Sequence, residues 1–69
     1  MQAGQWVSWR NPAEARQLGW EESFGPGPFQ VVACIDRTAD GIPNGVIVKT
    51  RLGEREINTL CLVPADEPA

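Results

Sequence analysis

Alternating apolar and polar positions predict one strand near the start of the chain and a longer one near its middle. In residues 5–10, Val7 and Trp9 share one face and Trp6 falls on the other, because the side chains of a strand alternate with a period of two. Residues 29–36 are almost continuously apolar, which is typical of a strand covered on both faces. The positions expected to share one face of this second strand are Phe29, Val31, Ala33 and Ile35.

Shorter apolar segments predict the rest of the sheet. Residues 45–51 form a third strand, and residues 52–54 are a tight hairpin turn that leads into residues 55–57. Residues 58–60 are expected to form a single 3₁₀ turn before a last strand at residues 61–63. The remaining connections, rich in Gly, Pro, Asn and Asp, are expected to be a loop at residues 20–28 and a turn at residues 37–44.

One short helix is expected between the first two strands. Asn11 is a strong N-cap residue, Pro12 suits the first helical position, and Glu14 stands where a capping box places its acid. Gly19 fits the position that ends a helix. The pattern therefore predicts about two helical turns over residues 12–18. Two apolar residues are expected to pack this helix on the sheet, Ala15 and Leu18.

Together these elements predict a mostly-β domain, a small barrel of four to five antiparallel strands with the short helix in the long loop after the first strand. The barrel is expected to be closed or half-closed, because closure removes exposed strand edges, which a chain of 69 residues has little material to cover. We expect a single domain over residues 1–63 and a disordered acidic tail over residues 64–69.

The order of elements resembles that of SH3-like barrels, in which a long loop precedes a three-stranded meander and a 3₁₀ turn precedes the last strand. Within that group, "GPFQVV" at residues 27–32 and "LVPA" at residues 62–65 resemble the SH3-like C-terminal domain of retroelement integrases. The resemblance spans residues 27–65 and implies the fold. Integrase domains of this kind are generally basic and carry a Trp directly before Gly-Pro, whereas this chain is acidic and Trp20 lies seven residues before Gly27. DNA binding is therefore not carried over.

The charge and the residue content of the chain argue against several classes of function. The net charge of −3 argues against binding driven mainly by contacts with nucleic-acid phosphates. The chain has no His and no recognisable set of acid, base and nucleophile, so we expect a protein that is not an enzyme and has no cofactor. We expect no membrane segment, because no apolar run approaches the roughly 20 residues that span a bilayer. No secretory leader is visible, and a cytoplasmic, reduced setting is expected.

Several other features favour structural roles. Residues 25–28 read Gly-Pro-Gly-Pro, which has too few backbone N–H groups to hold a phosphate and is too short for a proline-rich ligand. This segment is instead expected to end the loop and start the strand. Cys34 and Cys61 are expected to pack as buried thiols, and the alternative of a disulfide between them stays open.

Carboxylates give no clear catalytic or metal site. Glu21 and Glu22 are adjacent in a predicted loop, whereas paired acid–base catalysis needs carboxylates held in different environments. The spacing of Asp36, Asp40 and Asn44 does not match a calcium-binding loop. We expect no metal site.

Two surfaces remain as candidates for binding. The first is an aromatic and proline-containing surface expected to bind a protein or peptide, formed by Trp6, Trp20, Phe24, Pro26 and Pro28. The competing interpretation is that Trp20 and Phe24 fold back to cap one barrel end. The second surface, an alternative that would bind nucleic acid, is a basic hairpin formed by Lys49, Arg51 and Arg55. The sequence thus predicts a non-enzymatic SH3-like interaction module, with a nucleic-acid-binding accessory domain as the alternative.

Overall fold

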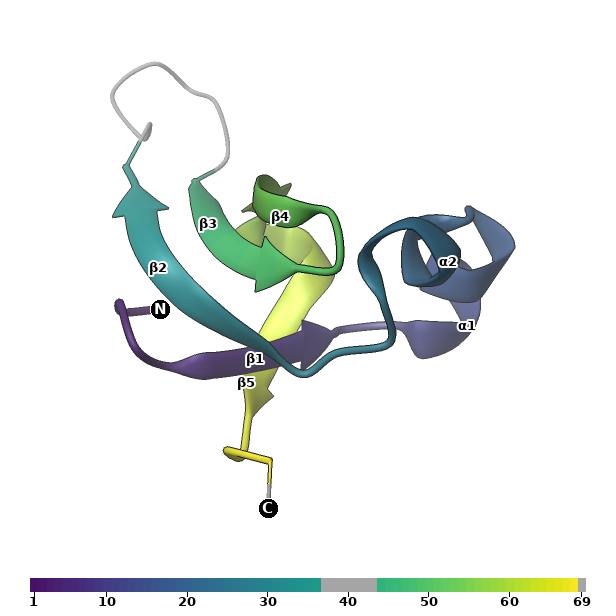
Figure 1. The fold of residues 1–69 in the computed structure, drawn as a ribbon, viewed down its shortest axis with the longest axis horizontal. Helices are drawn as coiled ribbons and strands as arrows, with labels where there is room; N and C mark the ends of the chain where they lie inside the picture. The colour runs from purple at the N-terminus through teal and green to yellow at the C-terminus, as the bar shows by residue number, and fades with distance from the viewer. Residues whose placement is uncertain (37–43, 69) are drawn as a thin grey trace.

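Five antiparallel strands form a single bent sheet in the order β4-β3-β2-β1-β5, with two short helices to one side of it (Figure 1). The computed structural model describes residues 1–36 and 44–68. The strands are β1 (Trp6–Trp9), β2 (Phe29–Ile35), β3 (Gly45–Thr50), β4 (Gly53–Asn58) and β5 (Leu62–Ala65). The helices are α1 (Pro12–Gln17), α2 (Trp20–Phe24) and the 3₁₀ helix η2 (Thr59–Cys61). The predicted mostly-β domain of five antiparallel strands is confirmed. The sheet is not closed, because β4 and β5 are its two edges.

Buried apolar side chains from every strand and from α1 form one core. They are Val7, Trp9, Ala15, Phe29, Val31, Val46, Val48, Ile57 and Leu62. The inward positions predicted for β1 and for the start of β2 are confirmed. The packing predicted for Leu18 is wrong, since this side chain is 54% exposed. The chain leaves α1 at this residue, and Trp20 and Phe24 of α2 pack against the core instead.

The capping pattern predicted for α1 is confirmed. The Asn11 side chain accepts a hydrogen bond from the Glu14 backbone N–H at 3.1 Å, and Pro12 occupies the first turn. Gly19 adopts a φ of 81° directly after the helix, a conformation that glycine takes without a steric penalty. The same glycine is the N-cap residue of α2. The loop predicted for residues 20–28 is therefore wrong over Trp20–Phe24, which is helical.

A register shift in β2 changes the faces of its second half. Val31 pairs with Val48, but after a bulge Ala33 pairs with Ile47 rather than continuing the same alternation. A bulge adds one residue to a strand and reverses which face the following side chains occupy. Ala33 and Ile35 therefore do not continue the face of Val31, contrary to the prediction, and both are half-buried.

The other boundaries differ from the predictions by one or two residues. The β3–β4 turn consists of Arg51 and Leu52, because Thr50 pairs with Gly53. The Thr50 hydroxyl donates to the Gly53 carbonyl at 2.6 Å and accepts from the Leu52 N–H at 3.1 Å. The 3₁₀ turn is confirmed as η2. Strand β5 includes residues 64 and 65, which were expected to belong to the tail. Apart from residue 44, the turn predicted at residues 37–44 lies outside the described residues.

The outer edge of β5 offers few backbone donors. The Arg10 N–H donates to the Cys61 carbonyl at 2.8 Å, and bonds of an antiparallel ladder recur at every second residue. This alternation places Pro64, which has no N–H, at a position facing away from β1. The Leu62 N–H is bonded to the Thr59 carbonyl within η2. At the opposite edge, on β4, the Arg55 Nη1 donates to the Glu54 carbonyl at 2.9 Å.

Candidate protein-binding site

Trp9 at the end of β1 organises a cluster of four aromatic rings. It is 4% exposed, and its Nε1 donates to the Gly25 carbonyl at 3.0 Å. The Phe29 ring meets it edge-on, with centroids 5.3 Å apart and an interplanar angle of 81°. The rings of Trp20 and Phe24 lie 5.7 and 6.3 Å from Trp9 in tilted arrangements. These distances fall in the range in which aromatic pairs attract beyond simple area burial, so the cluster holds α2 against the sheet.

Two adjoining hollows flank Trp20. The larger, of about 430 Å³, lies toward α1 and is lined among others by Arg10, Glu14 and Leu60. The smaller, of about 210 Å³, lies toward β4 and includes Phe24 and Ile57 in its walls. Three residues line both hollows, namely Trp9, Trp20 and Cys61. We call the two hollows together the Trp20 groove. The smaller hollow is mainly apolar and the larger one is lined by polar and apolar side chains in similar measure, so the groove can take up an apolar side chain that has polar neighbours.

Three leucines of the described residues are exposed, and one of them lines the groove. Leu18, 54% exposed, stands two residues before Trp20. Leu60, 60% exposed, lines the larger hollow. Leu52, 52% exposed, follows Arg51, which contacts α2. Large apolar side chains that gather at the surface mark interaction sites more often than single scattered ones do.

Charged side chains also line the groove. Arg10 and Glu14 line the larger hollow with exposed side chains. On the far side of α1, the Arg16 Nε and Glu21 Oε1 form an ion pair at 3.6 Å whose Arg16 side chain is 71% exposed. An exposed pair of this kind contributes little to stability. The groove thus combines exposed charged side chains with partly buried apolar ones, as protein interfaces do.

The structure brings together only part of the predicted aromatic surface. Trp20 and Phe24 both line the Trp20 groove. Trp6 is half-buried on the opposite face of β1 from Trp9, where it pairs with residues 30 and 65. Pro26 and Pro28 lie in the link between α2 and β2 and line neither hollow of the groove. The predicted surface therefore divides between two faces of the sheet.

Of the residues that line the groove, only Trp20 and Phe24 were given a binding role from the sequence. Cys61 was expected only to pack in the core, and Leu60 was assigned no binding role, yet both line the larger hollow. Their place depends on η2 lying beside Trp20, which is a tertiary contact. A local signal did exist for α2, since Trp20 and Phe24 stand four residues apart, a spacing that places two side chains on one helix face.

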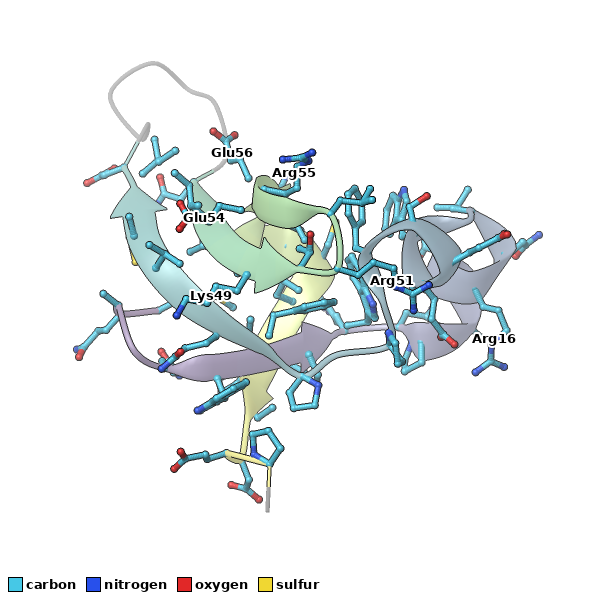
Figure 2. The ribbon with its side chains drawn as sticks, viewed as in Figure 1. Arg16, Lys49, Arg51, Glu54, Arg55 and Glu56 are labelled. Atoms are coloured by element: carbon cyan, nitrogen blue, oxygen red, sulfur yellow. The ribbon has the colours of Figure 1, made fainter. Side chains whose placement is uncertain are left out.

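The predicted basic residues do not form one cluster (Figure 2). Lys49 pairs across the hairpin with Glu54. Arg51 lies in the turn and its Nη1 donates to the Glu22 carbonyl at 3.1 Å. Arg55 bonds to the backbone of its own strand. Each cation thus has a different local role.

Both cysteines are free thiols in the structure. Cys34, exposed at the end of β2, donates to the Met1 carbonyl at 2.9 Å, and Cys61 is half-buried in the groove. Within residues 1–36 and 44–68, no three His, Cys, Asp or Glu side chains come together as a metal ion would require. Helices in these ranges are too short and too polar to cross a bilayer. Comparisons of the chain with models of protein families, with curated proteins and with solved structures find no match.

Proposed function

We propose that the chain is a non-enzymatic SH3-like interaction module that binds a protein or peptide partner in the Trp20 groove. The SH3-like assignment is supported by the strand order β4-β3-β2-β1-β5. It is also supported by the long connection between β1 and β2, which holds both α-helices, and by η2 directly before β5. SH3-like barrels commonly bind peptides in aromatic grooves between their loops, and the resemblance extends that expectation to this chain.

The observation that carries the proposal is the Trp20 groove with the exposed Leu60 in its lining. A volume of about 430 Å³ is comparable to that of ordinary ligand pockets, which begin at about 300 Å³. Trp20 is half-buried, so one part of the indole anchors α2 on Trp9 while another part lines the groove. Aromatic residues at the centre of an apolar surface are the usual sites where binding energy concentrates.

The ligand expected here is an extended protein segment with at least one large apolar side chain. That side chain would enter the larger hollow against Trp20 and Leu60, and the charged side chains of Arg10 and Glu14 would contact the partner's backbone or polar groups. Burying one large apolar side chain contributes about 1.5–3 kcal/mol. The expected binding is therefore dominated by apolar contact and responds weakly to salt.

Selection of random peptides displayed on phage against the intact chain tests this proposal. Peptides recovered with the wild-type chain are then titrated against Trp20→Ala, with Trp6→Ala as the matched control on the other face of β1. Truncation of a central aromatic contact costs about 2 kcal/mol or more, so Trp20→Ala is expected to weaken binding at least about thirtyfold. Trp6→Ala is expected to change it less than about threefold.

A second variant separates binding from folding. Leu60 is 60% exposed, so Leu60→Glu places a charge in the groove without emptying the core. It is expected to abolish binding while leaving the thermal midpoint close to that of the wild-type chain. Peptides that bind Trp20→Ala and Leu60→Glu as tightly as the wild type would overturn the assignment of the groove, and so would a selection that yields no binder.

A further inference from the structure

Helix α2 depends on hydrogen bonds from elsewhere in the chain. It has five residues and no side-chain hydrogen bond at its N-cap, and a helix this short is not stable alone in water. Its C-terminal carbonyls would lack partners inside the helix. The Glu22 and Phe24 carbonyls instead accept hydrogen bonds from Arg51. The carbonyl of the C-cap residue Gly25 accepts one from Trp9.

Arg51 supplies two of these contacts from the tip of the β3–β4 hairpin. Its Nη1 donates to the Glu22 carbonyl at 3.1 Å, and its backbone N–H points to the Phe24 carbonyl at 3.4 Å. The guanidinium also lies over Gly25, because a Cβ added to this glycine would be 3.8 Å from the Arg51 Nη2. Figure 2 shows the Arg51 side chain reaching from the hairpin to α2.

The neighbouring cations do not make this connection. Arg55 bonds to the Glu54 carbonyl on its own strand, and Lys49 faces Glu54 across the hairpin. A guanidinium also presents several donors in a fixed plane, which a single ammonium group does not. Arg51 is therefore the residue of the basic hairpin that connects the sheet to the helix carrying Trp20 and Phe24.

We propose that Arg51 is a positioning residue for the Trp20 groove. By holding the C-terminal turn of α2, it keeps Trp20 in place in the walls of both hollows and Phe24 in place in the wall of the smaller one. Loss of the guanidinium leaves the ring contacts with Trp9 and the Trp9 hydrogen bond intact, so α2 is expected to open more often without the sheet unfolding. The effect on partner binding rests on the function proposed above, whereas the effect on α2 does not.

The two free thiols report the opening of α2 without any partner. Cys61 lines the groove beside Trp20, and Cys34 lies at the far end of β2 in contact with Met1. Alkylation by iodoacetamide, followed at each cysteine by peptide mass spectrometry, gives a rate for the groove and a reference rate outside it. Arg51→Met removes the donors and keeps most of the apolar stem. Arg55→Met is the matched control. Arg51→Lys keeps the positive charge and tests whether that charge alone holds α2 in place.

Arg51→Met is expected to raise the Cys61 rate about fivefold, the factor that corresponds to one net hydrogen bond, with the Cys34 rate unchanged. Arg51→Lys is expected to fall between this variant and the wild type, and Arg55→Met to match the wild type. An unchanged Cys61 rate in Arg51→Met would refute the proposal. Equal acceleration at both cysteines, or failure of this variant to fold, would refute it as well, because Arg51 would then support the whole domain rather than α2.

The same variants are titrated with a peptide selected on the wild-type chain. Arg51→Met is expected to bind it about fivefold more weakly, with Arg55→Met unchanged. A raised Cys61 rate with unaltered peptide affinity would overturn the link between α2 and binding while leaving α2 positioning supported. If no peptide is recovered, the function proposed for the groove fails and the thiol rates still decide the role of Arg51.

Discussion

At the scale of single residues, Trp9 connects more of the structure than any side chain in the groove around it. Its ring contacts Trp20, Phe24 and Phe29, and its Nε1 satisfies the carbonyl of buried Gly25. A buried carbonyl left without a donor costs more than the hydrogen bond itself gains. The indole N–H is therefore as important here as the area of the ring.

Trp9→Phe is expected to lower the free energy of unfolding by about 2 kcal/mol, because the Gly25 carbonyl loses its donor and a small void opens. In a domain of this size each kcal/mol shifts the thermal midpoint by about 4–8 °C. Equilibrium unfolding in urea measures the loss. Trp6→Phe, on the other face of β1, is the control and should cost less than about 1 kcal/mol. Equal costs for the two variants would show that the Nε1 bond contributes nothing.

At the scale of elements, the two α-helices form for different reasons. Helix α1 has a local signal, the Asn11 cap with Pro12 in the first turn and Gly19 after the end. Helix α2 lacks such a cap and is held by Trp9 and Arg51. One helix is therefore encoded by its own residues, and the other by residues distant in the sequence.

Asn11→Ala is expected to cost about 1 kcal/mol of stability, because the Glu14 N–H loses its acceptor. Asn11→Ser should restore most of it, since a serine hydroxyl caps in the same way. Urea denaturation of both variants, with Gln17→Ala on the exposed surface of the same helix as the control, measures the difference. A loss in Asn11→Ala no larger than that of Gln17→Ala would contradict the capping role.

The limits of the sequence prediction follow from the same distinction. The strands, α1 and η2 were predicted because alternation, capping and turn residues act over a few positions. The bulge between Val31 and Ala33 was not, since no residue there marks the extra position. The groove was predicted only at Trp20 and Phe24, because its other walls come from the start of α1, η2 and the ends of β1 and β4, which meet only in the folded chain.

At the scale of the whole molecule, positive charge is spread rather than gathered. Lys49, Arg51 and Arg55 each have a separate local role, and the chain as a whole carries −3. Binding to a polyanion requires several cations on one face, because the affinity comes from the release of counterions. We therefore expect the chain not to bind polyanions in this way.

Labelled single- and double-stranded oligonucleotides are expected to show no saturable binding in fluorescence anisotropy at about 50 mM salt, a condition that favours phosphate contacts. The matched control is the double variant Glu54→Lys, Glu56→Lys. Each change adds two charges, which takes the net charge from −3 to +1 and should produce weak, salt-sensitive binding. Tight binding by the wild-type chain that weakens steeply at about 200 mM salt would instead support the nucleic-acid alternative.

The outer edge of β5 has a consequence for behaviour at high concentration. Strand edges with free N–H groups template the addition of further strands, which is how amyloid grows. Here the Leu62 N–H is bonded to the Thr59 carbonyl within η2, and Pro64 has no N–H. The β5 edge of this open sheet is therefore expected to resist seeded fibril growth, because its outward positions offer a proline and an N–H already bonded within η2.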